Sequence, residues 1–177
     1  MSAPPTHPCS VPDCGRPIVP TADRCRLHLA EALRAEGSAI PFDDPEMAAM
    51  WGLALFLTRG IVSDLPDDVR GAGAPYQALE MSAVVGEGST WQLAYGVLDM
   101  LGSHLIDEPP FMGMELPNAV QLDTGDVLLG LRVGVAAGAV TTMSPRLRFA
   151  CEAIVLEFVD AADIRGFEMH VRAEGVG

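Results

Sequence analysis

Three of the chain's four cysteines lie with a histidine in the segment CSVPDCGRPIVPTADRCRLH, residues 9–28. Their spacing is Cys9-x4-Cys14, then ten residues, then Cys25-x2-His28. Thiolate and imidazole groups are ligands that zinc prefers, and three cysteines with one histidine are a common structural set. Within each pair the two residues are close enough in sequence for one tight turn to present both to one ion. We therefore expect these four residues to bind zinc.

The residues around the two pairs support this expectation. Gly15 permits the sharp backbone turn that a loop needs beneath a bound sulfur. Asp23 is expected to cap a helix over about residues 24–36. Cys25 and His28 then lie three positions apart on the first turn of that helix and share one face. A loop knuckle would supply two ligands and a helix N-terminus the other two.

The alternatives to zinc are a reduced, unligated cysteine cluster and a disulfide. A disulfide would leave one cysteine unpaired and would give His28 no role. Four protein ligands fill the coordination shell, so the zinc would be structural rather than catalytic, and its binding would supply folding energy to a module with little core. His7 is not expected to be a ligand, and Cys151 lies in an apolar run typical of a core residue.

The segment resembles the small Cys-x4-Cys…Cys-x2-His zinc knuckle of phage and actinobacterial proteins, in which a Cys-x-Arg-Pro segment such as Cys14-Gly15-Arg16-Pro17 is common. Such knuckles often precede HNH endonuclease domains or occur in DNA-associated proteins. The resemblance covers about residues 9–34 and implies the same three cysteines and histidine as zinc ligands. It favours a zinc module.

The same resemblance argues against a nuclease. HNH chemistry needs closely grouped histidine and asparagine residues after the knuckle. Downstream of it the chain has only His104, His170 and the single Asn118, which are far apart in sequence.

Composition and charge limit the classes of partner. The 177 residues are 49% hydrophobic, enough for one domain with a core beside a small module. The net charge is −13, all 11 bases are arginine, and a lysine-free chain favours a GC-rich actinobacterial or phage genome. Charges cancel within residues 1–40, so residues 41–177 are strongly acidic and repel phosphate backbones. We expect a protein partner, with nucleic-acid contact only through Arg16, Arg24 and Arg26 of the zinc module.

The location is expected to be cytoplasmic, or the host cytoplasm for a phage protein. Residues 1–8 lack the basic and apolar regions of a secretory signal, and the longest apolar run, residues 47–58, is too short to span a membrane. The expected organisation is a disordered tail over residues 1–8, a zinc knuckle plus helix over residues 9–37, and an acidic α+β domain over residues 41–177.

The expected fold class is α+β, with a zinc knuckle, a helical middle and a small C-terminal sheet. Apolar periodicity and capping residues predict helices from Asp43 or Asp44 to Gly60 and from a Ser89–Gln92 capping box to Gly102. The remaining expectations are a slightly favoured helix over 75–84, an irregular connection over 105–120, strands over 127–135 and 167–173, and either helix or strand over 146–159. The apolar residues 109–117 would be an interface if the protein is a homo-oligomer.

Two further patterns could support catalysis. The segment LDTGD contains the Asp-Thr-Gly triplet of aspartic proteases, in which two carboxylates share a proton, so a homodimer would have to pair Asp123 with its copy. The same segment is also typical of a turn leading into a strand. His104 with Asp107 and Glu108 could bind a second metal.

The sequence therefore favours a non-enzymatic, zinc-containing interaction protein, regulatory, accessory or structural, that docks on a macromolecular partner. The alternative is a dimeric, aspartic-protease-like hydrolase that uses Asp123.

Overall fold

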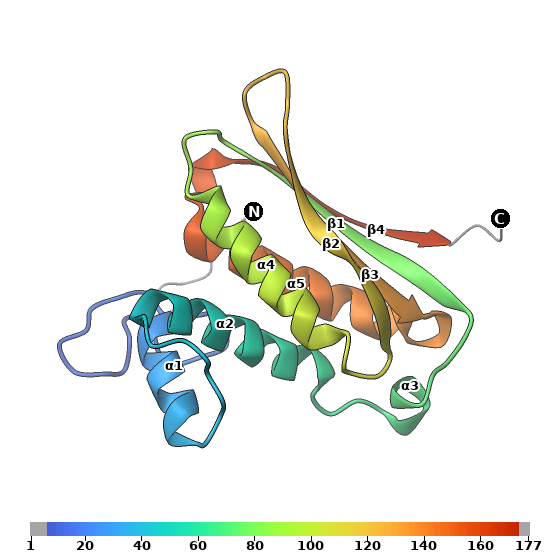
Figure 1. Ribbon diagram of the computed structural model, residues 1–177, viewed down its shortest axis with the longest axis horizontal. Coiled ribbons are helices and arrows are strands. Elements are labelled where there is room, and N and C mark those ends of the chain that lie inside the picture. The colour runs from blue at the N-terminus through green and yellow to red at the C-terminus, as the bar shows by residue number, and fades with distance from the viewer. Residues whose placement is uncertain (1–6, 174–177) are drawn as a thin grey trace.

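The computed structural model describes residues 7–173, apart from the side chains of residues 114–116 and 173. An N-terminal loop and three helices precede a region in which strands and helices mix (Figure 1). The elements are α1 (Arg26–Ala35), α2 (Pro45–Val62), α3 (Asp67–Arg70), β1 (Tyr76–Val85), α4 (Trp91–Leu105), β2 (Phe111–Gln121), β3 (Val127–Ala136), α5 (Val140–Phe158) and β4 (Ile164–Ala173). Short 3-10 turns, Ala137–Ala139 and Ala161–Asp163, flank α5. The expected α+β class is confirmed.

The four strands form one antiparallel sheet in the order β2-β3-β1-β4. From β1 onward the element order is βαββαβ, and with this strand order it is the ferredoxin-like arrangement. Helices α4 and α5 pack against the same face of the sheet (Figure 1). The sheet is not confined to the C-terminal part of the chain as expected, because its first strand, β1, lies near the middle.

Alternation of side chains along the strands places the core between the sheet and the helices. In β1, Leu79 and Met81 are buried and lie opposite Val133 and Leu131 of β3, which are buried too. Their neighbours in sequence, such as Glu80, point to the other face. Pairs of apolar residues across neighbouring strands therefore fix the register, since a slip by one residue would bring polar side chains into the core.

Helix α2 is the central helix, because it packs against α1, α4 and α5. Asp44 accepts a hydrogen bond of 2.9 Å from the backbone amide of Met47, and Pro45 occupies the first position of the helix, so Asp44 rather than Asp43 is the cap. The helix continues past Gly60, its expected end, to Val62. A Cβ atom on Gly52 would lie 3.2 Å from the Cα of Ala30. The absence of a side chain at Gly52 thus lets α1 approach α2 closely.

Four local expectations need correction or resolution. Residues 75–84, where a helix was favoured, form β1, and much of the expected irregular connection over 105–120 is β2. The hydrogen bonds of β2 come from β3, and those of β1 come from β3 and β4. Local propensity does not reveal these partners, because they lie further along the chain. The contested residues 146–159 belong mostly to α5. The Ser89–Gln92 capping box is wrong, because the Ser89 hydroxyl donates to the carbonyl of Gly86.

None of the helices in the described part of the chain combines the length and the apolar character needed to cross a bilayer.

Candidate metal centre

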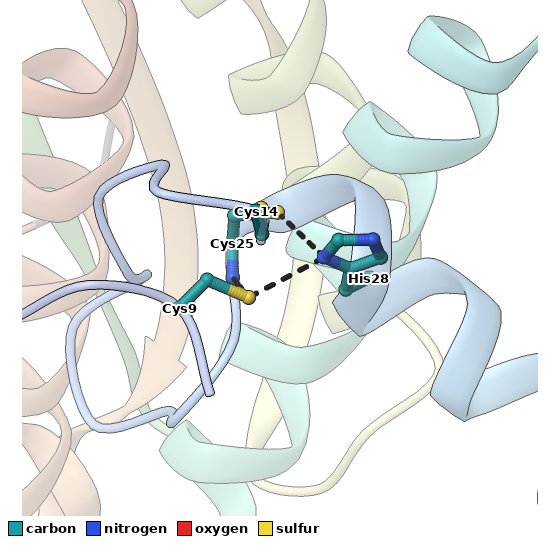
Figure 2. Close-up of side chains that lie close together, drawn as sticks. All are labelled: Cys9, Cys14, Cys25 and His28. Atoms are coloured by element: carbon teal, nitrogen blue, oxygen red, sulfur yellow. Dashed lines mark hydrogen bonds between the residues drawn. The ribbon is translucent and has the colours of Figure 1, made fainter. Parts of the chain in front are cut away.

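The three cysteines and the histidine of the N-terminal segment meet at the start of α1 (Figure 2). The Sγ atoms of Cys9 and Cys25 lie 3.3 and 3.4 Å from Nδ1 of His28. The Sγ atom of Cys14 lies 3.8 Å from that of Cys25. All four potential ligand atoms lie within 4.8 Å of one another. The structure thus brings together the whole set that the spacing predicted, from two separate segments.

These distances fit the ligand shell of one tetrahedral zinc ion. With Zn–S of about 2.3 Å and Zn–N of about 2.0 Å, a tetrahedron has edges of roughly 3.8 Å between sulfurs and roughly 3.5 Å between sulfur and nitrogen. The Sγ atoms of Cys14 and Cys25 are 3.8 Å apart, which matches the sulfur–sulfur edge. The distances of 3.3 and 3.4 Å from Cys9 and Cys25 to His28 are close to the sulfur–nitrogen edge. The donor set, Cys3His, is also one that zinc prefers.

The first pair of ligands is held by a short looped segment. The backbone amide of Cys9 donates to the carbonyl of Arg16 at 2.9 Å, and Pro8 forms an isolated antiparallel bridge with Pro17. Gly15 has φ of +64°, a conformation that glycine adopts readily, as the turn required. Pro8 is therefore part of this loop, whereas residues 1–6 of the expected tail lie outside the described residues.

The second pair is positioned by the first turn of α1. The carbonyl of Cys25 accepts the first helical bond, from the amide of Leu29 at 2.8 Å, so Cys25 is the N-cap and His28 follows on the first turn. The expectation that Asp23 caps this helix is wrong. Its carboxylate accepts from the hydroxyl of Ser10 at 3.3 Å, which ties the two halves of the module together.

Hydrogen bonding and burial act in opposite directions on the thiols. Burial disfavours the thiolate of Cys9, but backbone donors from Cys25 and Val11, together with His28, outweigh it and lower the pKa of Cys9 to about 6. The amide of Cys25 donates directly to the Cys9 sulfur at 3.3 Å. Burial raises the pKa of Cys25, and the neighbouring thiols of Cys14 and Cys9 add to this effect. Repulsion between neighbouring negative sulfurs opposes the deprotonation of further cysteines in the cluster. A cation bound between the sulfurs would offset that repulsion.

The remaining cysteine lies apart from the cluster. Cys151 is fully buried in α5, where burial and then the charge of Glu152 raise the pKa of its thiol well above the ordinary value. The interpretation of Cys151 as a core residue is confirmed.

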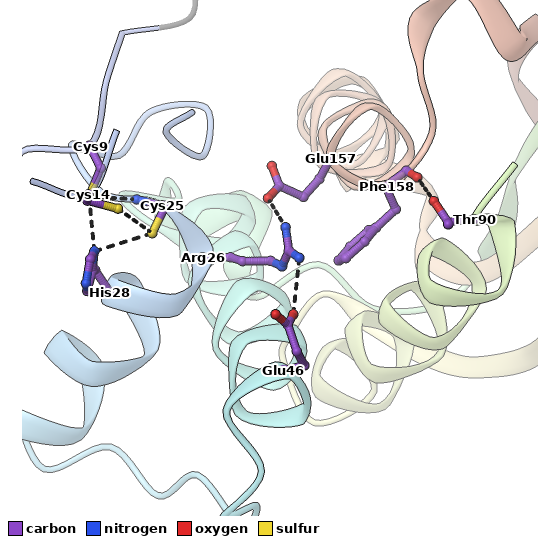
Figure 3. A network of polar contacts seen from close by, with 9 residues as sticks. All are labelled: Cys9, Cys14, Cys25, Arg26, His28, Glu46, Thr90, Glu157 and Phe158. Carbon is purple, nitrogen blue, oxygen red and sulfur yellow. Dashed lines mark hydrogen bonds and ion pairs between the residues drawn. The ribbon is translucent and has the colours of Figure 1, made fainter. Parts of the chain in front are cut away.

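A polar network that the sequence did not reveal joins the metal centre to the rest of the fold (Figure 3). Arg26, which directly follows Cys25, donates to Glu157 of α5 at 3.0 Å and to Glu46 of α2 at 3.1 Å. Its guanidinium carbon also lies 5.1 Å from the centre of the Phe158 ring. Burial alone would lower the pKa of Arg26, but the two carboxylates raise it, which keeps the guanidinium charged. No local sequence signal could have found partners 20 and 131 positions away.

The other candidate residues lie elsewhere. Asp123 is exposed in the turn between β2 and β3, where the amide of Leu122 donates to the carbonyl of Asp126 at 2.8 Å and Gly125 has φ of +91°. The segment therefore forms the turn that leads into the strand.

A second metal site does not form around His104. Its ring packs edge-on against Trp51, with 4.5 Å between centroids. Within the described residues, the cluster of three cysteines and His28 is the only group of three or more potential ligands. The second metal site that His104, Asp107 and Glu108 could have formed is therefore not found among the described residues.

Comparisons of the chain with protein-family models, with curated proteins and with solved structures find no match. The function must therefore be argued from the geometry of the site. The resemblance of residues 9–34 to phage and actinobacterial zinc knuckles stays a prediction.

Proposed function

We propose that the protein is a non-catalytic, zinc-containing interaction protein. Zinc held by Cys9, Cys14, Cys25 and His28 would fix the shape of residues 9–37 and keep α1 against α2. The observation that carries this proposal is the convergence of four potential ligand atoms within 4.8 Å, three of whose separations are close to the edges of a zinc tetrahedron. With four protein ligands, the shell has no position for a substrate, and the role of the metal is structural.

The partner in this proposal is another protein. Residues 41–177 carry the whole net charge of −13, which disfavours a nucleic-acid partner for this part of the chain. The zinc module is nearly neutral, and its arginines are the only candidates for contact with nucleic acid. We place the protein in the cytoplasm, as a regulatory, accessory or structural protein of a phage or an actinobacterium, with self-association as a further form of interaction. The support for this origin is the knuckle resemblance and the lysine-free composition.

Affinity capture with matched variants tests this function. The intact chain should retain partner proteins, whereas Cys14→Ser, which removes a half-exposed ligand, should lose both zinc and the partners. Cys151→Ala would be the control, because it removes a thiol outside the cluster. Equal capture by the intact chain and Cys14→Ser, despite loss of zinc, would contradict a role for the module in interaction.

The alternative hydrolase has its own test. If Asp123 acted as half of a protease dyad, Asp123→Asn would abolish peptide cleavage by a dimer. In the proposed interaction protein, Asp123→Asn leaves partner capture unchanged, and neither form cleaves peptides.

A further inference from the structure

A trough of about 970 Å³ lies between the zinc module and the helical layer. Helices α1 and α5 both pack against α2, and the trough runs over the C-terminal half of α2 between them. Its apolar lining includes Leu29 and Leu33 of α1, Phe56 and Ile61 of α2, and Phe149 and Ala150 of α5. The trough is open to solvent along one side.

Phe149 makes the trough an exposed apolar surface. Its side chain is 47% exposed, although it lies on a helix whose other face is buried in the core. Phe56, across the trough, is half-buried. Other exposed large apolar residues, such as Leu93 of α4, lie outside this lining. Further apolar lining residues, among them Leu33 and Ile61, are buried and form the floor of the trough. Exposed aromatic surface over an apolar floor is typical of an interaction site.

The charge around the trough differs from that of the rest of the chain. Arg24, Arg59 and Arg146 line it with two acids, Asp23 and Glu36, and Arg24 lies 4.0 Å from Asp23. Because the chain has 11 arginines and 24 acids, eight arginines and 22 acids are left for all other positions. The trough is thus a locally positive surface on a strongly acidic protein.

The position of Arg146 is fixed by the end of α2. One of its terminal nitrogens, Nη1, donates to the carbonyls of Ile61 at 3.0 Å and Ser63 at 2.6 Å. The guanidinium is therefore held at the wall of the trough by backbone carbonyls, and no carboxylate of the described residues forms an ion pair with it. Arg59 donates to the hydroxyl of Ser38 at 3.0 Å, which is also a neutral acceptor.

We propose that this trough binds an amphipathic helix of a partner protein, whose apolar stripe is flanked by acidic residues. The apolar stripe would pack on Phe149 and Phe56, and the acidic residues would lie next to Arg59 and Arg146. An open trough walled by helices suits a fourth helix, whereas small-molecule sites enclose most of their ligand. This inference rests on the proposed function and names the partner class for it.

The zinc module supplies one wall of this trough. Leu29, Leu33 and Glu36 belong to the segment that follows the metal ligands, and Arg26 anchors the same helix to α5. The trough consequently depends on docking of α1. We expect metal-free protein to bind the helix more weakly than zinc-loaded protein does.

The probe for the test is a displayed library of 16-residue amphipathic helices with a fixed apolar stripe and randomised flanking positions. Selection on the zinc-loaded full chain should enrich acidic flanks. Enriched peptides should bind Phe149→Ser and Arg59→Glu at least about tenfold more weakly, as for residues central to an interface. Leu93→Ser and Arg148→Glu are the matched controls, since they change an exposed apolar residue and an exposed arginine outside the lining. The controls should bind like the unchanged chain.

Three outcomes would overturn the proposal: no enriched peptide, enrichment of basic flanks, or equal loss of binding in the control variants. Binding of the apolar anion anilinonaphthalene sulfonate in the trough without any helix binder would also overturn it, in favour of a small-ligand site. Zinc analysis of the same samples distinguishes a failure of the trough proposal from a failure of the proposed function. A fully zinc-loaded chain that binds no peptide contradicts only the trough, whereas a chain without zinc contradicts the proposed function.

Discussion

Arg26 and Glu157 are 131 positions apart in the chain, yet their side chains form an ion pair of 3.0 Å. The pair joins the residue next to the candidate metal ligand Cys25 to the last turn of α5. The Thr90 hydroxyl at the start of α4 in turn donates to the carbonyl of Phe158 (Figure 3). The N-terminal module is thereby connected through α5 to the helical layer that covers the sheet.

Loss of this ion pair should destabilise the protein. The side chains of Arg26 and Glu157 are only 25% and 13% exposed, so Arg26→Met would leave a largely buried carboxylate without its partner. We expect a loss of about 2–4 kcal/mol in the free energy of unfolding, measured by urea denaturation. Arg165→Met is the control, because its nearest carboxylate, Asp126, lies 3.9 Å away and its side chain is 49% exposed. Equal stability of the two variants would show that the pair contributes little.

The cysteines should fall into two reactive classes. Zinc would protect Cys9, Cys14 and Cys25 from a thiol reagent, and a chelator should make all three react quickly. Cys151 should react only after unfolding, because it is fully buried and its pKa is raised. Time-resolved thiol titration with and without chelator measures both classes. Three fast thiols in untreated protein would contradict metal protection.

His104 should make stability depend on pH in the mildly acidic range. Burial, and then the charge of Arg59, lower the pKa of His104 below the ordinary value of 6.5, with Asp107 opposing. The unfolded chain therefore binds the proton more readily, and stability falls as the pH drops below about 6.5 towards the folded pKa.

The comparison for His104 is made between variants, because any loss of bound zinc at low pH would also lower the stability of the unchanged chain. His104→Gln should lose less stability between pH 7.5 and pH 5.5 than the unchanged chain does, in urea unfolding at both values. A pH dependence unaffected by His104→Gln would contradict this assignment.

Gly134 of β3 should not tolerate a side chain. A Cβ atom there would overlap the backbone carbonyl of Met112 on β2, and backbone cannot move aside as a flexible side chain can. We expect Gly134→Ala to lower the free energy of unfolding by about 1–3 kcal/mol, as for other overpacked positions. Gly166→Ala on β4 is the matched control, since none of the described residues lies within 4 Å of its added Cβ. Similar melting temperatures for both variants would refute the close approach of β2 and β3.

The cluster of potential metal ligands could be predicted from the sequence because its determinants are local. Four ligands lie within 20 residues, and a glycine turn and a helix start are enough to position them. Helix α2 was predictable for the same reason, since Asp44 and Pro45 mark its start. By contrast, β1 and β2 could not be predicted from local sequence, because their hydrogen bonds come from strands that follow them in the chain: β3 for both, and β4 as well for β1.

The links between the module and the remainder of the chain could not be predicted. The partners of Arg26 come from α2 and α5, and the trough combines residues from both ends of the chain. Phe149 has no sequence feature that separates it from the buried apolar residues of the same helix. Only the packing of α1 and α5 on α2 shows that its side chain lines an open surface.

X-ray absorption at the zinc edge, together with elemental analysis of protein purified without added metal, tests the central claim most directly. The account predicts one zinc per chain with three sulfur ligands and one nitrogen ligand. A chain free of zinc, or a shell completed by a solvent oxygen, would contradict it.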